Sequence, residues 1–325
     1  MAANRTEKIA GAGARYVLVV GSANVDVSVS TAVLPRPGET VFGDGSVISI
    51  GGKGANQAVA AASCGAATKF VARTGDDAFG SMVREALGAR GVQIDEVRAL
   101  AGTTTGLAAI YVEKSGQNCI VVVPGANAQL MPSDVEQIRP LIRDAAIVVL
   151  QCEIPMETVY RTIEIAVECD TQLILNPAPY RRLDLARSGR GITYLVPNEN
   201  EASQIGAMPV ETVAQAEQCA SGLRAQGIDC VIVTLGAQGC LVVDHGPARH
   251  FAAHRVTSVD TTGAGDAFVG CLAASLATGR SRDESIRRAV VYSALSVTQR
   301  GAQLSYPRRE DYERVWSRVD ETGAG

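Results

Sequence analysis

The chain has 325 residues, which at about 100–200 residues per domain suffices for one large domain or two smaller ones. Hydrophobic residues make up 46% and charged residues 20%, which is typical of a globular protein and excludes a disordered or coiled-coil chain. The 30 basic and 34 acidic side chains give a net charge of -4, so the basic excess of a nucleic-acid-binding protein is missing.

Both ends of the chain are rich in small and polar residues, and we expect flexible tails over 1–14 and 322–325. Between them, short apolar segments bounded by Gly, Pro or Asn predict strands at 16–20, 147–150, 173–175, 194–196 and 231–235. Continuous apolarity indicates strands that are buried on both faces, as in a parallel sheet. Helical periodicity predicts helices over 54–64, 77–90, 156–168, 199–205, 211–226, 264–278 and 282–299. The alternation predicts a doubly wound α/β fold with a mostly parallel sheet between helices.

Two segments break this alternation. Residues 25–50 and 106–123 read as paired strands, the second pair joined by a turn at Ser115 and Gly116. They predict a small β-sheet beside the core, inserted discontinuously into a single domain that spans 16–310. The hairpin at 106–123 is apolar at consecutive positions, so apolar side chains point to both of its faces. We therefore expect both faces to be buried against another surface. One face is expected to close over a ligand and the other to pair with a second copy of the chain.

The eight cysteines include no C-x-x-C pair, and Cys119, Cys230, Cys240 and Cys271 stand in apolar segments. We therefore expect buried free thiols and a reducing compartment, in practice the cytoplasm. No apolar stretch approaches the 18 residues of a membrane span, so no membrane association is expected. The N-terminal segment lacks the apolar region of a secretory signal, although organellar targeting by that segment stays open.

Several common site motifs are absent. The segment before Lys53 lacks the first glycine of a Walker A loop, and the glycines near Gly263 do not complete a dinucleotide fingerprint. His245, His250 and His254 lie in a predicted hairpin, where His250 and His254 would be about 13 Å apart, too far to share a metal ion.

The strongest motif runs from Asp260 to Phe268 and reads DTTGAGDAF, at the start of an apolar helix. Small residues at a helix N-terminus let backbone N–H groups face an anion. Asp266 would lie beside that anion, where a carboxylate can accept the proton of a hydroxyl that attacks a phosphoryl group. A plain loop followed by a helix-capping aspartate is the alternative for this motif taken alone.

Two motifs near the N-terminus suit a polyol. Gly51–Gln57 reads GGKGANQ, where paired glycines permit close approach and Asn56 offers both a donor and an acceptor. Asn24 and Asp26 follow the first strand and, being two residues apart, point to the same side of an extended chain. An amide and a carboxylate side by side can bind vicinal hydroxyls, although a tight turn and an Asx turn explain the two motifs equally well when each is taken alone.

A fourth motif, Asn198–Glu201, reads NENE and follows a predicted strand. Carboxylates at a strand end can hold Mg²⁺ through water, and acidic residues also favour a helix N-terminus without any metal. Three lesser segments follow other elements: Glu153, Thr234–Gly236 and Gly301–Ser305.

Taken together, in this order and over residues 16–310, these motifs resemble the ribokinase-like carbohydrate kinases. The segments LPRPGETV, PGAN (124–127) and RGAQLSYP add to the resemblance, which is greatest to the members that phosphorylate ribose. The resemblance implies ATP-dependent transfer of a phosphoryl group to the 5-hydroxyl of D-ribose, with Mg²⁺ bound to ATP and K⁺ or another monovalent cation as activator. It also implies that the small β-sheet is a lid through which the protein forms a homodimer.

The resemblance implies a role for each matching position. Asp266 would be the general base, and Gly263, Ala264 and Gly265 would form the anion hole. The sugar would be lined by Asn24, Asp26, Gly52, Lys53, Asn56, Glu153 and Asp266. The nucleotide would lie along Asn198, Thr234, Gly236, Gly239 and Gly265, with Glu201 near Mg²⁺ through water. Asp260, Thr262 and Ser305 match the positions around the monovalent cation.

Deoxyribokinase, adenosine kinase and fructokinase activities remain alternatives within this class. A sugar or nucleotide sensor without catalysis and a nicotinamide-dependent oxidoreductase are alternatives outside it. The intact motif around Asp266 argues against the first of these, and the incomplete dinucleotide fingerprint argues against the second.

Overall fold

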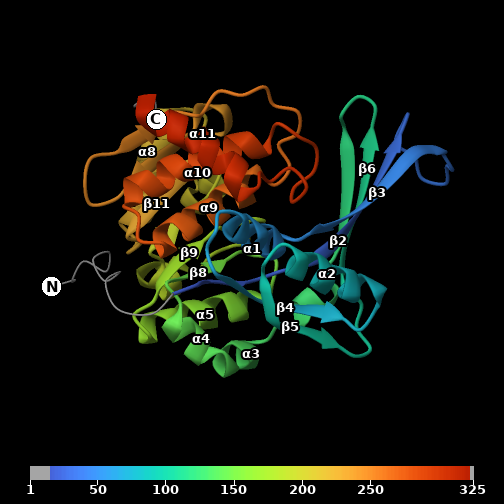
Figure 1. The fold of residues 1–325 in the computed structure, drawn as a ribbon, viewed down its shortest axis with the longest axis horizontal. Coiled ribbons are helices and arrows are strands. Elements are labelled where there is room, and N and C mark those ends of the chain that lie inside the picture. Colours follow the sequence, from blue (N-terminus) through green and yellow to red (C-terminus); the bar gives the residue numbers. More distant parts are fainter. Residues whose placement is uncertain (1–14, 323–325) are drawn as a thin grey trace.

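The computed structural model describes residues 15–322, which form an α/β core from which a second, smaller sheet projects (Figure 1). The tail predicted at 1–14 lies outside the described residues, as do 323–325. Thr322 is the last residue of helix α11 (Arg309–Thr322). This helix is anchored by Tyr312 and Trp316, which are buried against the core.

The core contains a nine-stranded sheet in the order β13-β12-β11-β10-β9-β8-β1-β4-β5. Its strands pair in parallel from β5 to β11, and β12 and β13 are antiparallel to their neighbours. This confirms the predicted doubly wound, mostly parallel fold. The strands are β1 (Val17–Val20), β4 (Thr68–Gly75), β5 (Gln93–Leu100), β8 (Ile147–Leu150), β9 (Gln172–Leu175), β10 (Tyr194–Leu195), β11 (Cys230–Thr234), β12 (Cys240–Val243) and β13 (Arg249–Phe251).

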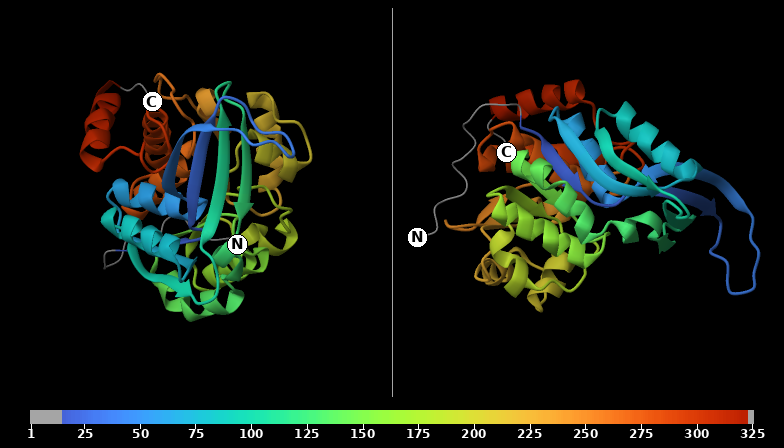
Figure 2. Two further views of the ribbon diagram at one scale, coloured as in Figure 1. Left: turned by 90° about the vertical axis from the view of Figure 1, so that its right-hand side faces the viewer. Right: turned by 90° about the horizontal axis from the view of Figure 1, so that it is seen from below.

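Helices cover both faces of this sheet, and each face has its own hydrophobic cluster (Figures 1 and 2). β1 shows why its residues form a central strand: Val17 and Val19 belong to one cluster, and Leu18 and Val20 belong to the other. One face carries α1 (Lys53–Ser63), α2 (Ala78–Ala89), α9 (Ala264–Ala277), α10 (Arg282–Ser296) and α11. The other carries α3 (Pro132–Gln137), α4 (Arg139–Asp144), α5 (Met156–Glu168), α6 (Leu185–Ser188), α7 (Glu199–Gly206) and α8 (Val213–Arg224).

Helices α1 and α9 pack closely because of Gly270. A Cβ atom at Gly270 would lie 2.5 Å from the Cβ of Ala60 and 2.6 Å from the carbonyl oxygen of Gln57. Only a residue without a side chain fits this contact. Since α1 begins in the GGKGANQ motif and α9 begins in the GAGD motif, the contact brings two of the predicted site motifs together.

The second sheet has the order β3-β2-β6-β7 and consists of β2 (Asn24–Thr31), β3 (Gly43–Gly51), β6 (Gly106–Glu113) and β7 (Asn118–Val123). This confirms the small sheet predicted from 25–50 and 106–123. It extends from the core as an arm, seen face-on and from below in Figure 2. Every residue of β7 is exposed, including Ile120, Val121 and Val122.

The five strands predicted from apolar segments are confirmed as β1, β8, β9, β10 and β11. Strands β4 and β5 of the same sheet were not predicted. All eight cysteines are unpaired, and Cys230, Cys240 and Cys271 are buried as expected. The expectation for Cys119 was wrong: it lies on exposed β7, in an apolar segment that the monomer leaves uncovered. Within residues 15–322, no helix combines the length and apolar character needed to cross a bilayer.

Candidate active site

Polar side chains gather where five neighbouring strands of the core sheet end, in the order β11-β10-β9-β8-β1. Ligands in open α/β sheets bind at the carboxyl ends of the strands, so this edge is the expected place for a site. The side chains at or just after these strand ends are Thr234, Asn198, Asn176, Gln151 with Glu153, and Ser22 with Asn24.

Asp266 lies in the first turn of α9, only 5% exposed, and two amides from α1 hold its carboxylate. Asn56 donates from Nδ2 to Oδ2 at 3.0 Å, and Gln57 donates from Nε2 to Oδ1 at 2.9 Å. Each oxygen thus has one side-chain donor and retains a further lone pair. A hydroxyl placed beside Asp266 can donate its proton to that lone pair.

The start of α9 is held by an unusual backbone conformation at Gly263. This residue is the N-cap of α9 with φ +76°, and its carbonyl oxygen accepts a hydrogen bond from the hydroxyl of Tyr306 at 3.0 Å. A Cβ atom here would lie 2.7 Å from the Cβ of Ala302. The amide of Ala264 donates to Thr261 at 3.2 Å, which leaves the amides of Gly263 and Gly265 as the better placed donors for an anion.

Glu153 ties the start of α1 to the end of β1. Its Oε2 accepts hydrogen bonds from the hydroxyl of Ser22 at 2.5 Å and from the backbone amide of Lys53 at 3.0 Å. Gly52 is the N-cap of α1, between Lys53 and the end of β3. The predicted residues Gly52, Lys53 and Glu153 therefore lie together.

Asn24 is buried, and its Oδ1 accepts a hydrogen bond from Nδ2 of Asn127 at 2.7 Å. Asn127 also accepts from the amide of Ala23 at 2.9 Å, so it fixes the chain where β1 passes into β2. Asn24 and Asp26 alternate with Val25 along β2 and therefore share one face of the second sheet.

Four carboxylates and one ammonium group dominate the electrostatics. Burial, together with the charges of Glu153 and Asp266, raises the pKa of Asp26 to about 6. The charge of Asp266 is the main cause that raises the pKa of Lys53, with Glu153 and Glu201 adding to it. Lys53 therefore carries a positive charge between these acids, where it offsets their mutual repulsion and can stabilise further negative charge.

Asn198 and Glu201 form a capping box at the start of α7. The Asn198 side chain accepts from the amide of Glu201 at 2.8 Å, and Glu201 Oε2 accepts from the amide of Asn198 at 2.9 Å. Burial raises the pKa of Glu201, and its Oε1 is not used in the box. A backbone bridge joins Asn198 to Thr234. Gly236 and Gly239 flank the turn that follows Thr234.

Asp260 joins two loops at the other side of α9. Its Oδ1 accepts from the amide of Thr262 at 2.9 Å and from its hydroxyl at 2.6 Å, and its Oδ2 accepts from the amide of Gly301 at 2.8 Å. These bonds lower the pKa of Asp260. Ser305 is buried and its hydroxyl donates to the carbonyl of Ala302 at 2.8 Å. The side chain of Asp260 is therefore occupied, so a cation here would depend on backbone carbonyls.

Comparison with known proteins identifies the family. Residues 14–309 match the model of the pfkB family carbohydrate kinases. The chain belongs to this family. In sequence, this carbohydrate kinase is 36% identical over 302 residues to a deoxyribokinase of Salmonella typhi, an alignment that covers 93% of this chain and 98% of the relative. It is also 36% identical over 297 residues to a ribokinase of Haemophilus influenzae, covering 91% and 97% of the two chains.

Solved structures agree with the sequence relatives. The structure of Arabidopsis thaliana ribokinase complexed with ribose and ATP superposes with a TM-score of 0.88 and 34% identity, covering 93% of this kinase and 99% of that chain. A ribokinase of Thermotoga maritima gives a TM-score of 0.85 at 34% identity, with coverages of 93% and 99%. This likeness supports the assigned fold over almost the whole chain.

The sequence did not assign roles to four amide side chains that the fold places around Asp266. Gln57 and Gln303 belong to two of the motifs, but a motif does not show which side chains its residues contact. Gln151 and Asn176 directly follow β8 and β9, and this position at strand ends was the one signal available for them. Asn127, within the PGAN motif, likewise could not be linked to Asn24, which lies 103 residues earlier.

Among the described residues, no group of three or more His, Cys, Asp or Glu side chains is arranged to hold a metal ion. The three histidines fall in and near the β12–β13 hairpin, as predicted, and His250 bonds to the carbonyl oxygen of Gln238 at 2.8 Å. A divalent ion in this kinase would therefore need ligands from a bound molecule and water, with a single carboxylate such as Glu201 nearby.

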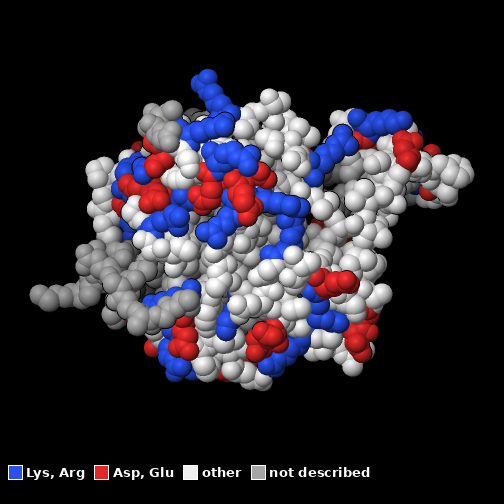
Figure 3. Space-filling model, in the orientation of Figure 1, with Lys and Arg blue, Asp and Glu red and all other residues white. Residues whose placement is uncertain are grey.

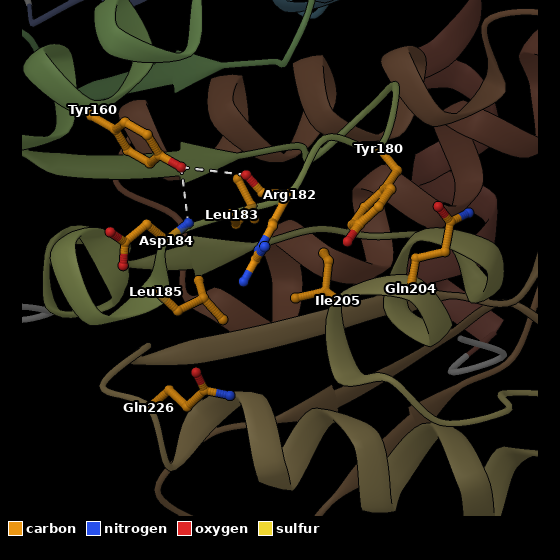
Figure 4. A pocket seen from close by; sticks show the side chains of 9 residues that line it. All are labelled: Tyr160, Tyr180, Arg182, Leu183, Asp184, Leu185, Gln204, Ile205 and Gln226. Carbon is orange, nitrogen blue, oxygen red and sulfur yellow. Dashed lines mark hydrogen bonds between the residues drawn. The ribbon is translucent and has the colours of Figure 1, made fainter.

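A separate cavity of about 610 Å³ lies beside α5, α6 and α7 (Figure 4). Its wall includes Tyr160, whose hydroxyl accepts from the amide of Asp184 at 2.8 Å and donates to the carbonyl of Arg182 at 3.5 Å. None of the predicted site residues lines this cavity. The candidate active site is therefore the strand-end cluster around Asp266, and the cavity is distinct from it.

Proposed function

We propose that this chain is a ribokinase, which transfers the γ-phosphoryl group of ATP to the 5-hydroxyl of D-ribose and releases ADP. The observation that carries the proposal is the position of Asp266: a buried carboxylate in the first turn of α9, directly after the Gly263–Gly265 segment at which this helix begins. A proton acceptor next to an anion-binding helix terminus is what phosphoryl transfer to a hydroxyl requires.

In the proposed reaction, the 5-hydroxyl oxygen bonds to the γ-phosphorus while the bond between this phosphorus and the bridging oxygen of ADP breaks. The hydroxyl proton passes to the carboxylate of Asp266. Amides of Gly263 and Gly265 donate to phosphate oxygens as negative charge shifts towards ADP, and that of Ala264 would join them on releasing the carbonyl of Thr261. Because the hydroxyl proton leaves late in a loose transition state, a weak base at Asp266 is adequate.

The sugar is proposed to lie between Asn24, Asp26, Gly52, Lys53, Asn56 and Glu153. Asp26 and Glu153 supply acceptors for sugar hydroxyls, and the Lys53 ammonium group supplies donors. All of these residues come from the second sheet, the start of α1 or the end of β8, which meet at one edge of the core. Fixing the sugar at this edge would place its 5-hydroxyl next to Asp266.

The nucleotide is proposed to lie along Asn198, Thr234, Gly236, Gly239 and Gly265. Mg²⁺ would be held by the phosphates and water, with the free Oε1 of Glu201 as the nearest protein acceptor. When bound, the ion neutralises phosphate charge. The capping box fixes the position of Glu201, so this carboxylate needs no rearrangement to receive a hydrated ion.

K⁺ or another monovalent cation is proposed to bind between the loops of Asp260–Thr262 and Gly301–Ser305. Asp260 would act by holding the loops together, since its carboxylate already accepts three hydrogen bonds. The ligands would then be backbone carbonyls, with Ser305 and Thr262 within the same loops. Such a cation would stabilise the start of α9 and thereby the anion hole.

The second sheet is proposed to be a lid over the sugar and the surface through which two copies form a homodimer. The exposed apolar side chains of β3 and β7 support this, since Val47, Ile120 and Val121 are each more than half exposed in the single chain. The projecting arm is largely uncharged on the face in view except near its tip (Figure 3). Light scattering should give twice the chain mass of 33.9 kDa, and a monomer would refute the dimer.

A second substrate, 2-deoxyribose, has specific support, because the Salmonella deoxyribokinase is as similar to this chain as the Haemophilus ribokinase, at 36% identity. The deciding experiment measures ADP release with ribose, 2-deoxyribose, fructose and adenosine, each with and without K⁺. We expect the highest kcat/KM with ribose and stimulation by K⁺. A clear preference for 2-deoxyribose or adenosine would overturn the ribose assignment.

A further inference from the structure

A continuous chain of buried amides leads from the core sheet to the carboxylate of Asp266. The backbone carbonyl of Val196 accepts from Nδ2 of Asn176 at 2.8 Å. Oδ1 of Asn176 then accepts from Nε2 of Gln57 at 3.1 Å, and the same Nε2 donates to Asp266 at 2.9 Å. The chain crosses the ends of β10 and β9 before it reaches α1 and α9.

This chain has a fixed polarity. A backbone carbonyl can only accept, so Val196 forces Asn176 to present Nδ2 to it and Oδ1 to the other side. That oxygen in turn forces Gln57 to present Nε2. If the Gln57 amide were reversed, its oxygen would face two acceptors, Asn176 and Asp266, and all three side chains are buried. The sheet backbone therefore determines that Gln57 offers N–H groups to Asp266.

Gln151 holds the other end of the Gln57 amide. Its Nε2 donates to Oε1 of Gln57 at 2.6 Å, while its own Oε1 is buried and has no partner among residues 15–322. Both side chains are almost fully inaccessible, at 1% and 0% exposed. Burying an unpaired acceptor is costly. We therefore infer that Gln151 is buried here for the sake of its hydrogen bond to Gln57.

Asn56 is held in the same manner from the opposite side. Its Oδ1 accepts from Nε2 of Gln303 at 2.9 Å, which directs its Nδ2 towards Oδ2 of Asp266. Asn56 is also one of the proposed sugar-binding residues, whereas Gln57 is fully buried and turned towards the sheet. Gln57 is thus the donor to Asp266 that is oriented by two amides at strand ends, Asn176 and Gln151.

We propose that Gln57 is a positioning residue for Asp266, oriented by Asn176 and Gln151, and that it fixes the plane of the carboxylate so that a lone pair meets the incoming hydroxyl. The inference rests on the proposed function, because it gives Gln57 a role through the general base. The inference gives Gln57 a different role from Asn56, its neighbour on α1, which is a proposed sugar-binding residue. Loss of Gln57 should slow the chemical step and leave sugar and nucleotide binding intact.

The test compares Gln57→Met, which preserves the length of the side chain, with the unmodified protein. We expect kcat to fall about 10- to 100-fold, while the KM values for sugar and ATP stay within about threefold. In the Asp266→Asn background, Gln57→Met should lower the residual kcat by less than about twofold, because the residue acts through the missing carboxylate. An equal loss in both backgrounds, or an unchanged kcat in Gln57→Met, would overturn the proposal.

Thr171→Val is the matched control, since Thr171 is buried at the opposite end of β9 and its hydroxyl bonds to the carbonyl of Ile142 at 2.9 Å. It should lower the melting temperature with little effect on kcat. If Gln57→Met does not fold, Asn176→Leu should lower kcat in the same direction but less, and a normal kcat in that variant would count against the proposal. If Asp266→Asn itself kept full activity, the proposed function would fail, whatever the result at Gln57.

Discussion

The carboxylate of Asp26 lies directly over the α-carbon of Gly51, so close that a Cβ atom on Gly51 would meet Oδ2 of Asp26 at 2.1 Å. The two residues share one face of the second sheet, where Asn24 pairs with Gly51 and Asp26 pairs with Ser49. The glycine therefore makes room for an acid whose burial raises its pKa to about 6. The site keeps this acid at a cost in stability.

Replacing Asp26 by Asn should stabilise the protein and weaken sugar binding. In the unfolded chain the pKa is near 3.8, so the folded protein binds the proton more tightly and loses stability as pH rises from about 4 to about 6. Asn carries no charge, so the gain in melting temperature should be about 1–4 °C at pH 8 and close to zero near pH 4. Thermal melts at both pH values and the KM for sugar test this; an equal gain at both pH values would contradict it.

Asp266→Asn should fold normally and lose most activity, because an amide cannot accept the hydroxyl proton. We expect kcat to fall by at least about 10²–10⁴-fold, the usual contribution of a general base. Sugar binding measured by calorimetry should change much less. Turnover close to that of the unmodified protein would refute the role of Asp266.

Two glycines at the start of α9 should respond differently to alanine. At Gly263, φ is +76° and a Cβ atom would lie 2.7 Å from Ala302, so Gly263→Ala should destabilise the fold by about 1–3 kcal/mol. At Gly265 a Cβ atom meets nothing within 4 Å, so Gly265→Ala should leave stability unchanged or slightly higher. It should still lower kcat/KM for ATP, since the methyl group would enter the proposed phosphate site. Urea unfolding and steady-state kinetics of both variants would separate these effects.

Gly270→Ala should damage both stability and activity, although Gly270 is a full turn away from Asp266. The added methyl group would lie 2.5 Å from Ala60 and 2.6 Å from the carbonyl of Gln57, so α1 and α9 would have to separate. We expect a loss of about 1–3 kcal/mol in stability and a lower kcat at temperatures where the protein stays folded. Gly222→Ala on α8, where a Cβ atom meets nothing within 4 Å, is the control and should leave kcat unchanged and stability unchanged or slightly higher.

If the second sheet is a lid, sugar should protect it. Hydrogen exchange of 25–50 and 106–123 is expected to slow when ribose is added, because closure buries these strands. Strand β8, which is already fully buried, should not change and serves as an internal reference. Equal exchange in the second sheet with and without sugar would argue against closure.

The strands that could be predicted from sequence are those whose residues are apolar on both faces, such as β1 and β8. β4 was missed because it contains Lys69 and Arg73, and Arg73 is buried only because Asp134 pairs with it at 2.9 Å. β5 was missed because it is an edge strand in which adjacent Asp95 and Glu96 break the alternation of apolar and polar residues. Arg73 can be buried because Asp134 pairs with it, and these two residues are far apart in the sequence. A local sequence pattern therefore gives no sign that Arg73 belongs to a buried strand.

The same limit applies to the candidate site. The motifs predicted Asp266 and Asn56 as candidate site residues, since glycine-rich turns next to helix starts are local features. The contact between them joins residues 210 positions apart, and that between Gln57 and Asn176 spans 119 positions. Which amides surround Asp266 depends on the packing of α1 against α9 and on strand order, so it required the fold.

The separation between Asn56 and Asp266 has a consequence for biosynthesis. The chain emerges from the ribosome from its N-terminus, so α1 and the second sheet are made long before α9. Until α9 arrives, the buried amides of α1 have no carboxylate to bind and the apolar surface that receives α9 is open. We therefore expect the nascent chain to bind no sugar, and to be most prone to aggregation, until about the last fifth of it has been synthesised.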